Sequence, residues 1–192
     1  MRDAEGLGLF GGAFDPPHRG HVALLAAARR ELGLGRVVVL VAADPAHKHV
    51  DTPADVRLRL AQAAFPGEEI ELDPYPRTVD LLRAHAEWTD AIFLIGADQF
   101  CDLPGWKEPD EVLRLVRLGV ATRPGFPRER LDAVLHGLER ADRVSFFALE
   151  PTPVASRELR ARLEAGADVD GDIPAGALRI IRAERLYRAG RR

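Results

Sequence analysis

Three absences in the 192-residue sequence narrow its class before any motif is considered. No run of about 18 apolar residues, the length that a membrane-spanning helix needs, occurs anywhere. The first ten residues, MRDAEGLGLF, lack the long apolar core of a signal peptide. The single cysteine, Cys101, excludes an internal disulfide, so the protein does not need an oxidising compartment. We therefore expect a cytoplasmic protein in which Cys101 is a buried structural thiol.

Lysine is also scarce, and there is no excess of positive charge. Only Lys48 and Lys107 are lysines among the 27 basic residues, and the formal net charge is -3. Genomic base composition or heat adaptation explains this arginine bias better than function does. The acidic balance gives no basic surface for nucleic acid or for a membrane, so we expect neither partner. The sequence leaves open whether the protein forms a homo-oligomer.

Segments typical of strands and of helices alternate along the whole chain. Residues 36–42 (RVVVLVA) and 91–95 (AIFLI) are typical of strands that are covered on both faces. Residues 21–32 have alanine, leucine and charge at helical spacing. This alternation predicts an α/β fold, a Rossmann-like doubly wound parallel sheet with helices on both faces. The sequence contains no linker and no internal repeat, so we expect a single domain over residues 1–192. The other expected strands are 7–10, 69–72, 118–122 and 144–149, and the other expected helices are 54–64, 78–87, 108–115, 128–138, 156–164 and 175–188.

Ligands of such sheets bind at the carboxyl ends of the strands, so the loops there should carry the chemistry. The loop after the first strand reads GGAFDPPHRGH, residues 11–21. It is not a common phosphate loop, because the chain has no GxxxxGK[ST] and no GxGxxG that opens a helix after a strand. Gly11 and Gly12 would let a ligand approach the backbone closely.

Two histidines stand where this loop enters the next helix. His21 lies at the helix N-terminus, where free amides and the dipole favour an anion, and His18 can point into the same space. Such a pair suits a phosphate that gains negative charge in a transition state. Either histidine alone would be interpreted as a loop or cap residue, but the pair within this loop favours function. Zinc is not indicated, because no cysteine or third ligand lies nearby, and we assign no metal ligand.

The string GGAFDPPHRGH resembles the HxGH signature of the nucleotidyltransferase superfamily. Its longer form, with FDPPH, is most similar to bacterial nicotinate-nucleotide adenylyltransferases. The resemblance extends from about Leu7 to Tyr187. It implies transfer of AMP from ATP to nicotinate mononucleotide, which gives nicotinate adenine dinucleotide and pyrophosphate in NAD biosynthesis. Mg²⁺ would be carried mainly by the triphosphate, because no acidic cluster suggests a cage in the protein.

Four later segments resemble the same family to different degrees. Residues 44–48 (DPAHK) resemble its Pro-Pro-His-Lys loop, with Ala46 in place of a proline, and residues 93–106 resemble its Ile-Gly-Ala-Asp and later tryptophan. Residues 155–160 (ASRELR) resemble Ser-Ser-Thr-x-Ile-Arg only in part, and Arg77 replaces a tyrosine in Ser-Tyr-Thr. The resemblance implies that the catalytic residues are His18, His21, Lys48 and Arg160. It implies that the nucleotide is bound by Gly11, Gly12, Ala13, Phe14, Gly96, Asp98 and Ser156. The acceptor would be bound by Asp15, His47, Thr78 and Trp106.

Two alternatives remain open from the sequence. The first keeps the chemistry and changes the acceptor to nicotinamide mononucleotide, phosphopantetheine or another phosphate, because Arg77 departs from the family at the nicotinate pocket. The second is a non-catalytic nucleotide-binding sensor, favoured only by the partial match at residues 155–160. Such a sensor would bind ATP without releasing pyrophosphate.

Overall fold

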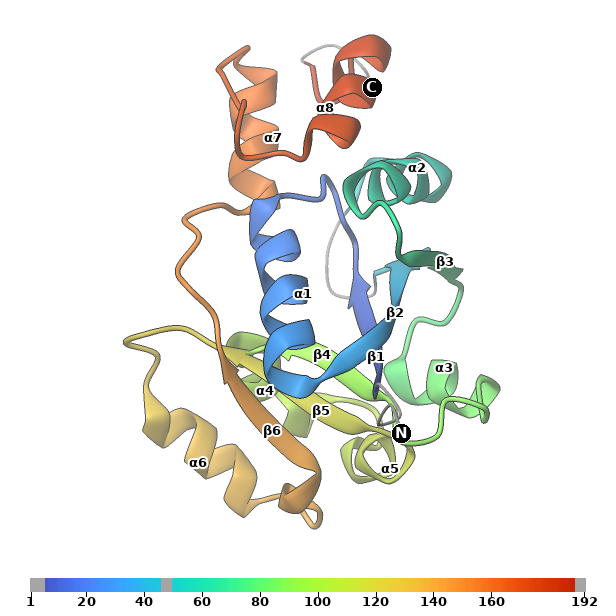
Figure 1. Ribbon diagram of the computed structural model, residues 1–192, viewed down its shortest axis with the longest axis vertical. Helices are drawn as coiled ribbons and strands as arrows, with labels where there is room; N and C mark the ends of the chain where they lie inside the picture. Colours follow the sequence, from blue (N-terminus) through green and yellow to red (C-terminus); the bar gives the residue numbers. More distant parts are fainter. Residues whose placement is uncertain (1–5, 46–49, 189–192) are drawn as a thin grey trace.

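The computed structural model describes residues 6–45 and 50–188, and its strands form one parallel sheet in the order β3-β2-β1-β4-β5-β6 (Figure 1). The strands are β1 (Gly6–Gly12), β2 (Leu34–Ala42), β3 (Glu69–Asp73), β4 (Ile92–Gly96), β5 (Arg117–Thr122) and β6 (Val144–Ala148). The helices are α1 (Arg19–Leu32), α2 (Ala54–Ala64), α3 (Thr78–Ala84), α4 (Ala97–Asp102), α5 (Pro109–Leu115), α6 (Arg128–His136), α7 (Ser156–Glu164) and α8 (Ala175–Glu184), with 3-10 turns η1 (Leu103–Gly105) and η2 (Ala141–Arg143).

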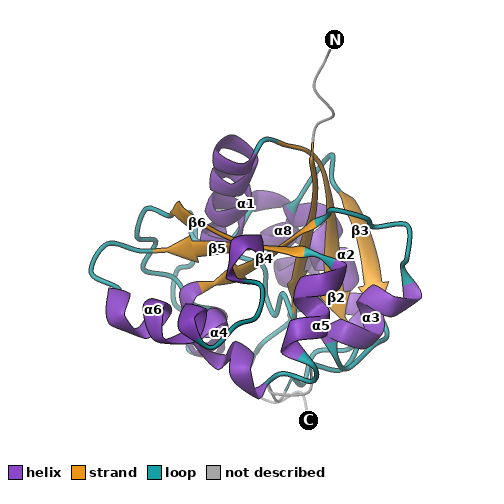
Figure 2. Ribbon diagram, turned by 90° about the horizontal axis from the view of Figure 1, so that it is seen from below, coloured by secondary structure: helices purple, strands orange, loops and turns teal. Residues whose placement is uncertain are grey.

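The side chains of each central strand alternate between two hydrophobic clusters, one on each face of the sheet. In β2, Val37, Val39 and Val41 join the cluster formed with α1, α2, α7 and α8. Val38 and Leu40 join the other cluster, which α3, α4, α5 and α6 complete. Figure 2 shows α1 on one side of the β4–β6 part of the sheet and α4 and α6 on the other. The predicted doubly wound sheet with helices on both faces is confirmed.

The strand order reverses between β1 and β4, which are hydrogen-bonded neighbours at the centre of the sheet. Beyond β1 the chain turns to β2 and β3, and beyond β4 it turns to β5 and β6. Loops that leave β1 and β4 therefore diverge at their carboxyl ends and leave room for a ligand there. Figure 1 shows α7 and α8 together at one end of the molecule, beside α2.

The structure differs from the prediction mainly in short helices and helix ends. The helix α4 was not predicted, because its six residues follow β4 directly and are too few for a periodic pattern. The predicted helix 78–87 ends at Ala84, and the last helix ends at Glu184, followed by left-handed Arg185. Cys101 is half-buried rather than buried. None of the described helices is long and apolar enough to cross a bilayer.

Candidate functional site

His18 and His21 form a stacked pair at the start of α1. Their ring centroids are 3.7 Å apart with an interplanar angle of 23°. The backbone N–H of His18 donates a hydrogen bond to Nδ1 of His21 at 3.2 Å, which orients the second ring. His18 is the N-cap of α1, where the Arg19 N–H donates to the Asp172 carbonyl at 2.8 Å and the His21 N–H donates to the His18 carbonyl at 2.9 Å. The structure thus brings together the two histidines that the sequence singled out.

The His18 ring is buried without the hydrogen bonds that usually accompany burial. Its exposed fraction is 8%, and its Nδ1 has no hydrogen-bond partner within the described part of the chain. Burial lowers the pKa of His18 to about 4, against a smaller opposite effect of the Asp172 charge. The ring is therefore neutral at neutral pH and can donate one hydrogen bond. A buried, unpartnered polar atom of this kind is typical of a functional site.

Phe14 holds the first loop in a strained conformation. Its φ of 50° lies in the left-handed region, which costs a non-glycine residue about 1–2 kcal/mol. The ring is 2% exposed and packs edge-on against Phe10, Phe65 and His21. A Cβ on Gly12 would lie 2.9 Å from this ring, so close packing by Phe14 already explains that glycine. The expectation that Gly12 admits a ligand is not needed to account for it.

The next two residues of the loop are held by side chains from the C-terminal part of the chain. The Ser156 hydroxyl donates to the Pro16 carbonyl at 2.9 Å, and Arg160 donates to the Asp15 carbonyl at 2.6 Å. The Tyr187 hydroxyl donates to the Asp15 carboxylate at 2.7 Å. Burial and the Asp15 charge raise the pKa of Tyr187 far above its usual value, so this hydroxyl stays protonated. Residues between 140 and 172 positions apart in sequence therefore meet at one loop.

This arrangement bears on the role expected for Asp15. Its exposed fraction is 3%, and Tyr187 and Arg160 already occupy its polar atoms. The side chain holds the loop in place from within the protein, so a direct contact with the acceptor requires this network to open. Ser156 and Arg160 remain half-buried, and they lie at the first turns of α7 as expected.

The end of β4 supplies the second half of the candidate site. Gly96 ends β4 and caps α4, and a Cβ built on it would meet no atom within 4 Å, so space is open beside it. Asp98 is exposed in the first turn of α4, where Arg123 donates to its carboxylate at 3.3 Å. Because β4 pairs with β1, Gly96 lies at the same edge of the sheet as residues 11–21, which we call the histidine loop.

The residues expected to meet the acceptor lie at the same edge. Thr78 is the first residue of α3, and Trp106 follows η1. Their segments are joined by Lys107, whose ammonium contacts the Asp80 carboxylate at 2.8 Å. Trp106 is half-buried against the second hydrophobic cluster, and Arg77 is exposed. The remaining two candidates, His47 and Lys48, lie outside the described residues.

A family model described as cytidylyltransferase-like matches residues 9–162, which include the histidine loop, Gly96 and Arg160. The chain belongs to the cytidylyltransferase-like family. Within it, a probable nicotinate-nucleotide adenylyltransferase of Rubrobacter xylanophilus is 34% identical, over 97% of this chain and 94% of its own length. Another, from Chromobacterium violaceum, is 36% identical over 95% of this chain and 98% of its own length. The resemblance indicated by the motifs is confirmed.

Two solved structures of one protein are similar to this chain over almost its whole length. Plasmodium falciparum nicotinic acid mononucleotide adenylyltransferase, complexed with NaAD, matches with a TM-score of 0.72 over 95% of this chain and 97% of that chain. The same protein complexed with APC matches with a TM-score of 0.71. Sequence identity is 18% and 17%, so these matches establish the fold.

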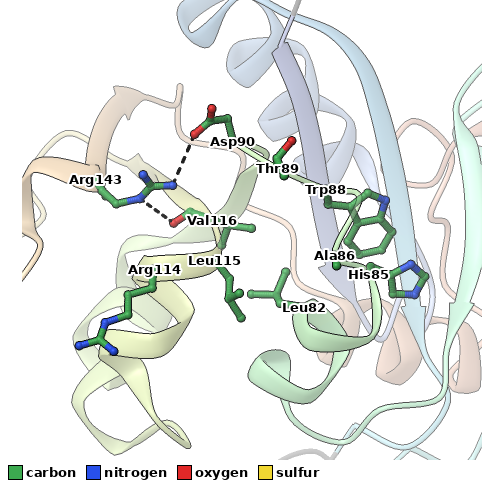
Figure 3. Close-up of a pocket in the computed structure, with 10 residues that line it drawn as sticks. All are labelled: Leu82, His85, Ala86, Trp88, Thr89, Asp90, Arg114, Leu115, Val116 and Arg143. Atoms are coloured by element: carbon green, nitrogen blue, oxygen red, sulfur yellow. Dashed lines mark hydrogen bonds and ion pairs between the residues drawn. The ribbon is translucent and has the colours of Figure 1, made fainter.

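Two cavities of similar size lie at opposite edges of the sheet of this cytidylyltransferase-like protein. One, of about 350 Å³, lies beside the histidine loop, and Asp15, Arg160 and Tyr187 line it. The other, of about 330 Å³, lies where β4, β5 and β6 begin, between Trp88, Leu115 and Arg143 (Figure 3). Among residues 6–45 and 50–188, no group of three or more acidic, histidine or cysteine side chains could hold a metal ion.

Sequence reasoning missed Arg57 and Tyr187. Arg57 is 2% exposed and lies on the same face of α2 as Leu60, Ala61 and Ala64. The burial of Arg57 could have been predicted, because an arginine at helical spacing with apolar residues points into the core. Tyr187 follows the end of α8 with a φ of 62°, and no local pattern links it to a loop 172 residues earlier.

Proposed function

We propose that this protein transfers the adenylyl group of ATP to nicotinate mononucleotide, with release of pyrophosphate. The observation that carries the proposal is the buried ring of His18, stacked on His21 at the start of α1, whose Nδ1 has no hydrogen-bond partner among the described residues; relatives within the family are named for this activity. The product would be nicotinate adenine dinucleotide, which places the reaction in NAD biosynthesis.

The α- and β-phosphates of ATP are proposed to lie at the N-terminus of α1. The helix dipole favours an anion there. An anion beside His18 would raise the pKa of the His18 ring from its low value and would accept a hydrogen bond from that ring. Arg160 and Ser156 lie at the adjoining loop and are proposed to complete the phosphate site, together with Lys48.

The adenosine and the acceptor are proposed to use the ends of β4 and α3. The open space beside Gly96 suits a nucleoside, and Asp98 can accept hydrogen bonds from a ribose if it exchanges its contact with Arg123. Gly11, Gly12, Ala13 and Phe14 are proposed to contribute backbone contacts to the nucleotide. Thr78, Trp106, Asp15 and His47 are proposed on the acceptor side.

The proposed reaction is a direct in-line displacement. An oxygen of the acceptor phosphate forms a bond to the α-phosphorus of ATP, while the bond from this phosphorus to the bridging oxygen breaks and pyrophosphate leaves. The acceptor phosphate is already ionised at neutral pH, so no general base is required. Positioning and charge stabilisation then account for catalysis. Mg²⁺ would enter as MgATP, carried mainly by the triphosphate.

Pyrophosphate release tests the proposal directly. The protein would be incubated with MgATP and, in separate reactions, nicotinate mononucleotide, nicotinamide mononucleotide or phosphopantetheine. We expect fast release with nicotinate mononucleotide and much slower release with the amide, because fixed donors to a carboxylate are only half satisfied by an amide. Release with a different acceptor would overturn the acceptor assignment. ATP binding without release in any reaction would favour a sensor.

A further inference from the structure

Arg57 has the largest fully buried side chain of the described residues. It lies on α2 and is 2% exposed, on a face that is otherwise apolar. Burying a guanidinium is costly unless hydrogen bonds satisfy its donors. Burial lowers the pKa of Arg57, although the charge stays on the group because its normal pKa is so high. A charge retained at this cost calls for a reason beyond packing.

The Arg57 guanidinium is hydrogen-bonded to four backbone carbonyl oxygens. Nη1 donates to Ala13 at 2.9 Å and to Ala42 at 2.7 Å. Nη2 donates to Ala43 at 2.9 Å, and Nε donates to Thr52 at 2.9 Å. These carbonyls belong to the loop after β1, the end of β2 with the loop that follows, and the segment before α2. One side chain thus joins three segments at the carboxyl edge of the sheet.

The contact with Ala13 fixes the peptide that precedes the strained Phe14. This peptide is planar and trans, so the N–H of Phe14 points opposite to the Ala13 carbonyl and therefore away from Arg57. Four residues further on the loop reaches His18. A rotation of this peptide would move the backbone that carries both histidines. The contacts with Ala42 and Ala43 similarly fix the start of the loop after β2.

We propose that Arg57 is a positioning residue for adenylyl transfer, which fixes the loop after β1, through Ala13, relative to the end of β2 at Ala42 and Ala43. The inference rests on the proposed function, since the loop after β1 leads to His18 and His21, which are assigned to the ATP phosphates. Arg57 acts through the backbone and does not touch the reacting atoms. Lysine cannot replace it, because an ammonium has three donors at one point and the guanidinium has five in a planar fork.

The test compares Arg57→Lys with Arg59→Lys, the same substitution two residues along α2. Arg59 is exposed and forms an ion pair with Glu184, so it serves as the matched control. Thermal unfolding identifies a temperature at which all proteins are folded, and kcat and KM are then measured there. We expect Arg57→Lys to lower kcat ten- to hundredfold with KM for the acceptor within about twofold, because small misplacements cost rates of this size. Arg59→Lys should keep kcat within about twofold.

A normal kcat in folded Arg57→Lys would overturn the proposal. If Arg57→Lys does not fold, Arg57→Met, which keeps most of the side-chain volume, takes its place in the same comparison. Failure of both variants to fold would also overturn the proposal, because Arg57 would then serve stability alone. A tenfold rise in acceptor KM with unchanged kcat would likewise contradict positioning for the chemical step.

Wild-type protein measured in parallel separates this proposal from the proposed function. If the wild type releases no pyrophosphate with any acceptor, the proposed function fails, and affinity for a non-hydrolysable ATP analogue becomes the readout. Arg57 would still position the loop after β1 if Arg57→Lys binds the analogue about tenfold more weakly than Arg59→Lys does. Equal affinity of the two variants would overturn the positioning role.

Discussion

The two edges of the sheet carry cavities of almost the same volume and very different surroundings. At the carboxyl edge, the cavity of about 350 Å³ is lined by the buried carboxylate of Asp15, with Arg160 and Tyr187. At the amino edge, the cavity of about 330 Å³ has the ion pair of Arg143 and Asp90 at its rim (Figure 3). The Asp90 side chain is 86% exposed, so its charge needs no partner there.

The surroundings of these two cavities distinguish them better than their volumes do. At the carboxyl edge, polar groups are buried and are held by contacts from segments far apart in the sequence, such as Tyr187 with Asp15. At the amino edge, Arg143 also contacts distant segments, the Asp90 carboxylate and the Val116 carbonyl, but the carboxylate there is exposed rather than buried. Buried polar groups are costly, and a chain that retains them at one edge marks that edge as functional.

Removing a ring from each edge should give the largest contrast in turnover. We expect His21→Ala to lower kcat by about 10²- to 10³-fold, because a preorganised donor to transition-state charge is lost. His85→Ala is the matched variant at the amino edge and should retain kcat within about twofold. Steady-state pyrophosphate release measures both. The comparison fails if His85→Ala is the more damaging change, or if His21→Ala turns over normally while folded.

Acidification should destabilise the protein through His18. Its pKa is about 4 when folded and about 6.5 when unfolded, so between these values the unfolded chain binds the additional proton. The effect of His18 on the free energy of unfolding is small above pH 6.5, and this free energy falls by about 3 kcal/mol as the pH drops to 4. Urea unfolding from pH 7 to pH 4 measures it, with His18→Asn as the comparison. An unchanged pH dependence in His18→Asn would contradict the assignment.

Loss of the Tyr187 hydroxyl should weaken the carboxyl edge. Tyr187→Phe leaves the buried Asp15 carboxylate without its 2.7 Å donor, and we expect a loss of about 1–3 kcal/mol in the free energy of unfolding. Asp90→Asn removes the charge of the exposed partner at the amino edge and should change it by no more than about 0.5 kcal/mol. Chemical unfolding of both variants measures these changes. Equal losses in the free energy of unfolding would contradict the expected difference between the two edges.

The smallest effect is expected from the exposed pair of Arg123 and Asp98. Arg123→Ala removes a competitor for the Asp98 carboxylate, so KM for ATP should fall two- to threefold, within the range of exposed ion pairs. kcat should not change. Initial rates at varied ATP concentrations measure this, and a higher KM would indicate that Arg123 itself helps to bind the nucleotide.

The sheet and the histidine pair could be predicted from the sequence because their signals are local. The apolar run of residues 36–42 predicts a buried strand by itself, and His18 and His21 lie three residues apart at one helix start. The network beneath them depends on contacts between distant segments. Tyr187 reaches Asp15 across 172 positions, and Arg57 reaches Ala13 across 44, so neither contact leaves a local pattern.

A crystal structure of the protein with a non-hydrolysable ATP analogue would show directly where the triphosphate binds. We expect the triphosphate at the start of α1, within hydrogen-bond distance of the His18 and His21 rings, and the adenosine beside Gly96. A triphosphate bound at the amino edge, near Arg114 and Arg143, would contradict this expectation. So would one at the carboxyl edge that contacts neither histidine.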